Sequence, residues 1–223
     1  MLLRVSTIAL IIILAAGLSA QNLYTVTPLP VPALASNLTA TGINNSGEIV
    51  AHWDGPNTGL VPSYGATLYQ SGPSGVQELT LPVQYVGGIS NSGKIACATF
   101  QQVPQMVNPV TFAWEACVMG GGDTATIGFL PGDNDSNAIG VNDAGQVVGV
   151  SDTLPTDTVP FYSHGEAFLY SHGVITGLGY LPGDTKSGAF AINNSGQVVG
   201  YSSSSTGSHA FSLASGYRFG RDR

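Results

Sequence analysis

One six-residue phrase occurs four times along this chain. The copies are Gly42-Ile43-Asn44-Asn45-Ser46-Gly47, Gly88-Ile89-Ser90-Asn91-Ser92-Gly93, Gly140-Val141-Asn142-Asp143-Ala144-Gly145 and Ala191-Ile192-Asn193-Asn194-Ser195-Gly196. An Asn side chain can cap a turn, and a closing Gly adopts the left-handed conformation of a hairpin with a bulge. The phrase therefore predicts a β-hairpin turn whose structural positions are Asn44, Gly47, Asn91, Gly93, Asn142, Gly145, Asn193 and Gly196.

The residues around the phrase repeat as well. The four closing glycines lie 46, 52 and 51 positions apart, and a Leu-Pro pair recurs with similar spacing at 29–30, 81–82, 130–131 and 181–182. Such a period is typical of solenoids, propellers and arrays of small domains. Each repeat holds four short segments of β character, which predicts repeats at roughly 38–82, 85–131, 137–182 and 188–213.

The two ends of the chain are complementary. The first Leu-Pro segment, 23–30, has no preceding segments of its own, and the last repeat lacks a fourth segment. We therefore expect an all-β protein, a small β-propeller of four repeats with four antiparallel strands each, in which the N-terminal strand completes the last sheet. Pairing the ends in this way leaves few exposed strand edges. The alternative is an open or incomplete propeller or β-repeat array, which would leave an edge for a second copy, so a monomer is expected for the closed ring and an oligomer for an incomplete one.

Residues 1–20 have the pattern of a secretory signal peptide: Arg4, an apolar run from Val5 to Ala16, and small residues before Gln21. The apolar run is short of the ~20 residues that a membrane-spanning helix needs, although an uncleaved anchor is the alternative. Residues 21–223 then form one domain, with no integral membrane segment after cleavage. The formal charge of the chain is −7, and with only six Lys and Arg residues it is a poor partner for nucleic acid.

At His209-Ala210-Phe211, preceded by Gly196-Gln197-Val198-Val199-Gly200, the chain resembles the HAF-repeat family of probable extracellular bacterial proteins, named for its His-Ala-Phe tripeptide. Glu166-Ala167-Phe168 stands at this place in repeat three, Ala66-Thr67-Leu68 in repeat one and Thr111-Phe112-Ala113-Trp114 in repeat two. The resemblance covers essentially all of the chain after the leader. It implies a secreted protein, extracellular or on a bacterial cell surface, and it implies no catalytic residues.

The chain has two cysteines, Cys97 and Cys117. If Phe100 faces Val110 across their hairpin, Cys97 falls opposite Ala113 rather than Cys117. This register favours two buried thiols over a disulfide, although export would permit a bridge.

No motif for catalysis or metal binding is convincing. Asp133-Asn134-Asp135-Ser136-Asn137 has the spacing of the first three calcium-loop ligands, but Ala138 and Ala144 stand where the loop needs Gly and Glu. None of the four histidines has zinc-ligand spacing, and His209 is expected to pack at a strand start. Glu48, Glu78, Glu115 and Glu166 are expected on solvated strand faces. We therefore predict no cofactor, no metal and no catalytic residue.

The loops between the second and third strands of each repeat carry the candidate ligand-binding residues. In a propeller these loops share an end with the links between repeats, and they hold Trp53, Tyr64, Phe161 and Tyr162. Aromatic side chains beside small polar groups on loops suit a glycan or peptide ligand, although they can instead pin the loops to the sheets. The sequence thus favours a non-catalytic binding or cell-surface interaction module, and the alternative is a secreted propeller enzyme, a polysaccharide hydrolase or lyase.

Overall fold

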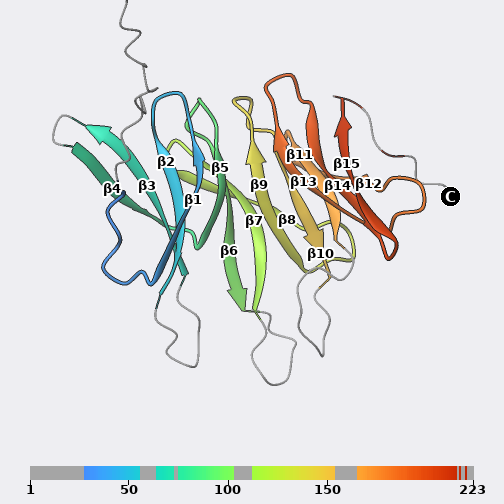
Figure 1. Ribbon diagram of the computed structural model, residues 1–223, viewed down its shortest axis with the longest axis horizontal. Helices are drawn as coiled ribbons and strands as arrows, with labels where there is room; N and C mark the ends of the chain where they lie inside the picture. Colours follow the sequence, from blue (N-terminus) through green and yellow to red (C-terminus); the bar gives the residue numbers. More distant parts are fainter. Residues whose placement is uncertain are drawn as a thin grey trace, which may run out of the picture.

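The computed structural model describes residues 28–55, 64–72, 75–102, 112–153, 165–214, 216 and 219. These residues form fifteen strands and no helix, so among them there is no helix that could span a membrane. The strands make four antiparallel sheets that stand face to face in a row (Figure 1). The strands are β1 (Asn37–Ile43), β2 (Ile49–Asp54), β3 (Tyr64–Gly72), β4 (Gly75–Leu81), β5 (Tyr85–Ile89), β6 (Ile95–Gln102), β7 (Phe112–Gly120), β8 (Asp123–Gly128), β9 (Asp135–Val141), β10 (Val147–Asp152), β11 (Glu166–Ser171), β12 (Val174–Gly179), β13 (Lys186–Ile192), β14 (Val198–Ser204) and β15 (Gly207–Leu213).

Each sheet is a simple meander in which consecutive strands are neighbours. The orders are β1-β2-β3-β4, β5-β6-β7-β8, β9-β10-β11-β12 and β13-β14-β15. The first strands of successive sheets lie side by side, β1 against β5, β5 against β9 and β9 against β13. Sheets radiating from one set of inner strands are the arrangement of a propeller, so the predicted fold class is confirmed.

The ring is not closed, which corresponds to the open alternative. The first and last sheets lie at opposite ends of the row (Figure 1), and in the described residues the last sheet has only three strands. Residues 23–27, predicted to supply its fourth strand, lie outside the described part of the chain, as does the predicted leader. Pro30, at the end of that predicted strand, instead contacts the first sheet, because its carbonyl accepts a 2.6 Å hydrogen bond from the Tyr69 hydroxyl.

The four repeated phrases form the turns between the first and second strands, as predicted. In each turn the closing glycine has a φ between +76° and +82° and donates its N–H to the residue three before it. The side chain of that residue caps the turn: the Asn44 Oδ1 accepts the amides of Ser46 and Glu48. In the second repeat the capping residue is Ser90, whose Oγ accepts the Lys94 amide, and not Asn91 as predicted. A hydroxyl and an amide oxygen both accept such a bond, which explains why the substitution is tolerated.

The turns are also bonded to one another, each to the next along the row. The Asn45 amide donates to Asn91 Oδ1 at 2.9 Å, and the Asp143 amide donates to Asn194 Oδ1 at 3.0 Å. Between them, the Ser92 amide donates to Asp143 Oδ1 at 3.1 Å. We call this set of bonds the turn ladder. It explains why Asn and Asp recur at positions whose side chains do not cap their own turn.

A test of the turn geometry uses two glycines. Gly47→Ala is expected to lower the free energy of unfolding by about 1–2 kcal/mol, because its φ of +76° places a Cβ in the left-handed region. The space around it is empty, so the cost comes from the backbone and not from a clash. Gly207→Ala is the matched control, since that site is equally open and has no positive φ. Urea unfolding of both variants checks this, and equal losses at the two sites would contradict it.

The core consists of three apolar layers, one between each pair of adjacent sheets. Val50 and Ala66 of the first sheet pack against the second, Ala96 and Ala116 of the second against the third, and Val148 and Ala167 of the third against the fourth. Each of the two middle sheets thus has a face toward the next sheet in the row and a face toward the preceding one. This division explains the strands whose two faces are both apolar.

In the second, third and fourth sheets, the third residue of the second strand pairs with a residue of the third strand, and these pairs lie in the layer toward the preceding sheet. The pairs are Cys97–Cys117, Gly149–Phe168 and Gly200–Phe211, and the equivalent pair on the outward face of the first sheet is Ala51–Thr67. A Cβ on Gly149 would overlap the Asn137 carbonyl oxygen and lie 2.9 Å from the Phe168 ring, and one on Gly200 would overlap the Gly188 carbonyl oxygen and lie 2.8 Å from the Phe211 ring. The glycine that ends Gly-Gln-Val-Val-Gly is therefore required first by the backbone of the inner strand and also by the phenylalanine that ends the tripeptide.

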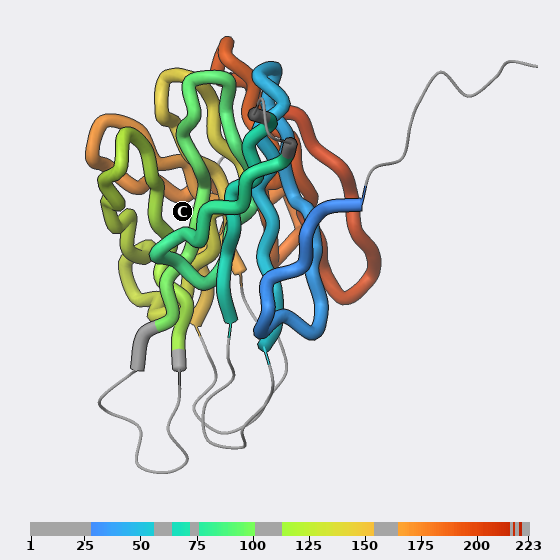
Figure 2. The backbone as a smooth tube through the Cα atoms, turned by 90° about the vertical axis from the view of Figure 1, so that its left-hand side faces the viewer, coloured from blue at the N-terminus to red at the C-terminus, as the bar shows by residue number. Residues whose placement is uncertain are grey.

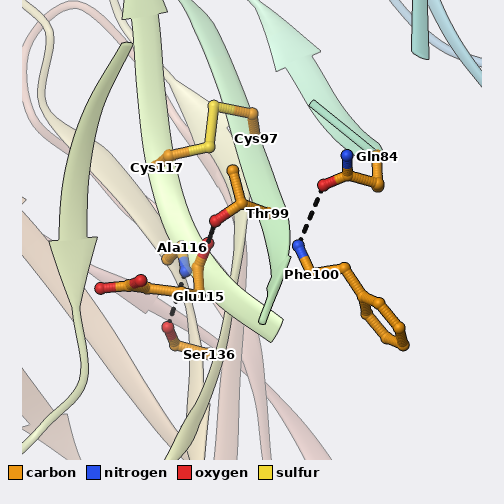
Figure 3. The surroundings of a disulfide bond; sticks show 8 residues. All are labelled: Gln84, Cys97, Thr99, Phe100, Glu115, Ala116, Cys117 and Ser136. Carbon is orange, nitrogen blue, oxygen red and sulfur yellow. Dashed lines mark hydrogen bonds between the residues drawn. A yellow bond between two sulfur atoms is a disulfide. The ribbon is translucent and has the colours of Figure 1, made fainter. Parts of the chain in front are cut away.

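Cys97 and Cys117 form a disulfide (Figure 3), so the prediction of two thiols is wrong. They face each other directly with Cα atoms 4.9 Å apart, and Phe100 faces Trp114 instead of Val110. The predicted register failed because it aligned the repeat-two tripeptide at residues 111–114. The register identifies Glu115-Ala116-Cys117 as the counterpart of Glu166-Ala167-Phe168, so the disulfide occupies the place of the Gly–Phe pair.

Candidate binding site at the loop end of the sheets

A cleft of about 300 Å³ opens at the end of the sheets opposite the turn ladder. It lies where β2 and β10 end and where β3, β5 and β9 begin, at the lower end of the sheets in Figure 2. This is the end that the sequence singled out for binding. The residues that line the cleft come from the first three sheets: His52, Asp54, Tyr64, Gln84, Tyr85, Trp114, Asp135, Asn137, Ile139 and Asp152.

Aromatic rings form one wall of the cleft. The Trp114 ring is the centre of this group, with its centroid 4.8 Å from Phe100, 5.4 Å from Tyr64 and 6.3 Å from Tyr85. His52 extends the wall, 4.8 Å from Tyr85. Rings held by one another at such distances are rigid and present apolar faces with polar edges, which suits recognition of a flat, partly apolar ligand.

Three carboxylates also line the cleft. Asp135 and Asp152 are cross-strand partners at the ends of β9 and β10, and both are almost fully buried. The Trp114 backbone amide donates to Asp135 Oδ1 at 2.6 Å, which ties the acidic side of the cleft to the aromatic side. Burial raises the pKa of Asp135 to about 6, the Trp114 amide opposes this, and the charge of Asp152 adds to it. Asp54, from β2, completes the set.

Two further lining residues are fixed by backbone contacts. The Gln84 Oε1 accepts the Phe100 amide at 3.0 Å, so this side chain is oriented by the second strand of its own sheet. The His52 Nδ1 lies 3.4 Å from the Val86 carbonyl oxygen of the next sheet. Polar groups held in this way need little reorganisation when a ligand binds.

Of the four residues predicted to bind a ligand, the structure places Tyr64 in the cleft. Trp53 does not line the cleft: its ring lies against Gly65, where it would meet a Cβ, and its buried Nε1 has no hydrogen-bond partner among the described residues. This position matches the alternative in which an aromatic residue pins its loop to the sheet. Phe161 and Tyr162 lie outside the described residues.

The sequence did not single out Tyr85, Trp114, Asp135 or Asp152 as ligand-binding residues. Each lies at or near the first or last residue of a strand, on the side of the links between repeats. The sequence signal that marks these residues is a polar or aromatic side chain at a strand end that faces the links between repeats. The loops between second and third strands do not contain them.

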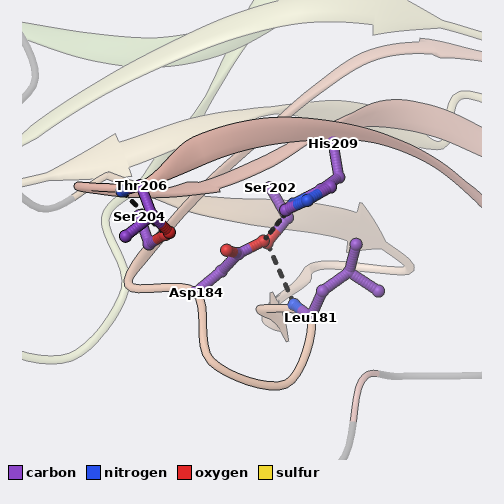
Figure 4. A network of polar contacts seen from close by, with 6 residues as sticks. All are labelled: Leu181, Asp184, Ser202, Ser204, Thr206 and His209. Atoms are coloured by element: carbon purple, nitrogen blue, oxygen red, sulfur yellow. Dashed lines mark hydrogen bonds and ion pairs between the residues drawn. The ribbon is translucent and has the colours of Figure 1, made fainter.

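The remaining candidates have structural partners. Asp133, in the calcium-like segment, accepts hydrogen bonds from Ser151 and Thr153, and the described residues include no group of three or more His, Cys, Asp and Glu side chains that could hold a metal ion. Glu166 is not solvated as predicted, because its buried carboxylate accepts the Gly179 amide at 3.0 Å. His209 lies 3.4 Å from Asp184, near the Leu181–Ser202 hydrogen bond that joins the link before β13 to β14 (Figure 4). A separate cavity of about 590 Å³ beside β12 is lined by residues 175–180, Phe219, Leu130, Pro131, Asp133 and Glu166.

Comparison with known proteins gives a fold-level similarity. No family model and no curated protein matches the chain. Among solved structures, it is similar to the β-propeller domain of the Trilobed protease from Pyrococcus furiosus, which is described as having an open velcro topology. The TM-score is 0.49 at 13% sequence identity, with 81% of this chain and 54% of that chain covered, so this chain spans about half the length of that structure. The HAF-repeat resemblance stays a prediction, and the four sheets and their shared inner strands make this chain an all-β protein of open propeller type.

Proposed function

We propose that this protein is an exported, non-catalytic binding module that holds a glycan in the cleft at the loop end of its sheets. The observation that carries the proposal is the presence of an aromatic group, centred on Trp114, and of carboxylate and amide groups in one cleft. Sugar rings combine apolar C–H faces with hydroxyl edges, so they match a site that offers both ring faces and hydrogen-bond acceptors.

The negative charge of the cleft limits the chemical class of ligand that it can bind. Among the described residues, Asp54, Asp135 and Asp152 line the cleft and no Lys or Arg does, so a strongly anionic ligand would meet like charge. A neutral glycan, or one with an amino substituent, meets no such repulsion. A peptide is the competing ligand, and a peptide array run beside the glycan array separates the two.

Two features support export. The first twenty residues have the order of basic, apolar and small residues found in secretory leaders. The chain also has a disulfide, Cys97–Cys117, and such bonds persist in oxidising compartments. Fractionation of the expressing cells with N-terminal sequencing tests export, and a retained protein beginning at Met1 would contradict it.

Binding is tested with a glycan array followed by calorimetry on the best ligand. Trp114→Ala is expected to weaken binding at least about tenfold, because it removes the ring on which the aromatic wall is built. Asp54→Asn, which leaves that wall intact, is expected to weaken binding while thermal unfolding stays unchanged. Val174→Ala, at an exposed position of β12 outside the cleft, is the matched control. Full binding by both cleft variants, or no ligand on the array, would contradict the proposal.

One observation favours a second candidate, a hydrolase that acts on a polysaccharide. A carboxyl group whose pKa is about 6 is suited to act as a general acid near neutral pH, and Asp135 has that pKa beside a second carboxylate, Asp152. A reducing-end assay across polysaccharides distinguishes the candidates. Turnover that Asp135→Asn abolishes would favour the enzyme, and binding without turnover would favour the module.

A further inference from the structure

The inner-strand surface that lines the cleft continues onto the last sheet. Two of the lining residues, Asn137 and Ile139, come from β9. Ile139 is the bulged residue of that strand, and Asn137 is the cross-strand partner of Val150. Because β9 and β13 lie side by side, the equivalent residues of β13 lie next to these two on the same surface.

The equivalent residues of β13 are Phe190 and Gly188. Phe190 is the bulged residue of the strand, and Gly188 is the cross-strand partner of Tyr201. A Cβ on Gly188 would lie 2.5 Å from the Tyr201 ring and 2.9 Å from the Val150 side chain. The glycine therefore lets the Tyr201 ring lie across the inner strand and beside β10. An aromatic ring thus takes the place that the Asn137 side chain has in the third sheet.

The two aromatic rings of the last sheet form an exposed pair. The ring centroids of Phe190 and Tyr201 lie 5.4 Å apart, with their planes tilted by 31°. Phe190 is 52% exposed although it is a large apolar side chain, and Tyr201 is half-buried. Ring faces with one hydroxyl edge repeat the chemistry of the aromatic wall around Trp114. We call Phe190 and Tyr201 the distal pair.

Asp152 connects the distal pair with the cleft. Its carboxylate lines the cleft, and its charge also acts on Tyr201. Burial raises the pKa of the Tyr201 hydroxyl, and the negative charge of Asp152 raises it further. Because the interaction between two charges falls with distance, the Tyr201 hydroxyl lies near the cleft and not on a remote part of the surface.

We propose that the distal pair is a second subsite of the cleft, so that the ligand is a linear glycan long enough to contact Trp114 and Tyr201 at once. This inference rests on the proposed function and adds the length and shape of the ligand. Trp114 belongs to the second sheet and the distal pair to the fourth, and packed sheets lie about 10 Å apart, so one sugar cannot contact both.

The shape of the glycan follows from this separation. A chain of equatorially linked sugars is extended and presents ring faces along its whole length, whereas an axially linked chain coils. The extended chain can therefore place one ring face on the aromatic wall and another on the distal pair. Asp152, between the two subsites, is a hydrogen-bond acceptor for the hydroxyl or amino groups of the sugars that join them.

The test measures affinity against chain length by calorimetry, with β-1,4-linked oligomers of glucose and of glucosamine from the disaccharide to the hexasaccharide. The wild type is expected to bind the hexasaccharide of one series at least about tenfold more tightly than its disaccharide. Phe190→Ala and Tyr201→Ala are each expected to lose most of this gain, and Tyr201→Phe, which keeps the ring, is expected to retain most of it. Val174→Ala, at an exposed valine of β12, is expected to bind like the wild type.

The outcomes separate this inference from the proposed function. Trp114→Ala is expected to weaken binding of every length, because it acts on the first subsite. Equal wild-type affinities for the disaccharide and the hexasaccharide, or a gain that survives Tyr201→Ala, would overturn the distal subsite and leave the glycan-binding cleft standing. The distal subsite is also overturned if neither series binds while the array identifies another glycan. Absence of binding to every glycan removes the proposed function itself and this inference with it.

Discussion

Replacing both Cys97 and Cys117 by alanine is expected to lower the free energy of unfolding by about 3 kcal/mol. The bridge closes a loop across a sequence separation of 20 residues, and the chain-entropy relation gives this magnitude for a loop of that length. Because the pair lies in the layer between the first and second sheets, the substitution also removes two completely buried sulfur atoms. Urea unfolding followed by tryptophan fluorescence measures the change.

The repeat itself supplies the control for this prediction. The double variant Cys97→Gly with Cys117→Phe restores the pair that the third and fourth sheets use at the same place, Gly149–Phe168 and Gly200–Phe211. It is expected to recover part of the stability that the alanine pair loses, because the ring refills the layer. An alanine variant with an unchanged urea midpoint would show that the bridge does not form or does not constrain the chain.

Asp135→Asn is expected to make the protein more stable at pH 8 by about 2–3 kcal/mol. The pKa of Asp135 is raised from an ordinary value of 3.8 to about 6, chiefly by burial, so the folded state holds this proton more tightly than the unfolded state does. The wild type therefore loses stability as the pH rises from about 4 to about 6, and the loss is complete above that range. Asparagine is neutral throughout and its oxygen can still accept the Trp114 amide.

The measurement is the urea midpoint of both proteins at pH 4, 5, 6, 7 and 8. The two are expected to converge at pH 4 and to diverge up to pH 7, with the variant the more stable. Asp152→Asn is a useful companion, since it removes the neighbouring charge and is expected to lower the pKa of Asp135. If Asp135→Asn is no more stable than the wild type at pH 8, burial does not penalise this carboxylate. A stabilising substitution in the cleft would mean that Asp135 is kept for binding and at a cost in stability.

The fold class could be predicted from the sequence because the phrase repeats. Turn residues at fixed offsets specify hairpins locally, so the Asn-Gly phrases predict the first two strands of each sheet without knowledge of tertiary contacts. The strand register in the second repeat could not be derived this way. It depends on which cross-strand pair fills the layer toward the preceding sheet, and a disulfide does this in repeat two where glycine and phenylalanine do it later.

The candidate site could be predicted from the sequence only in part. The correct end of the sheets follows from connectivity, because loops between second and third strands share an end with the links between repeats. The residues themselves, such as Trp114 and Asp135, come from different sheets and meet only because the inner strands stack in a particular order. The sequence also could not predict that the ring is open, because ring closure depends on the angle between packed sheets and not on any local sequence pattern.

The open row of four sheets is tested most directly by distances between turns. Spin labels can be attached to introduced ketone side chains at positions 46, 92, 144 and 195, which directly precede the closing glycines of the four turns, so the bridged cysteines are not used. Pulsed electron resonance, with labelled protein diluted in unlabelled protein, then gives the distances within one copy. We predict that the 46–195 distance is the longest and the 46–92 distance the shortest of those from position 46. A 46–195 distance as short as the 46–92 distance would mean that the sheets close into a ring and would contradict the account.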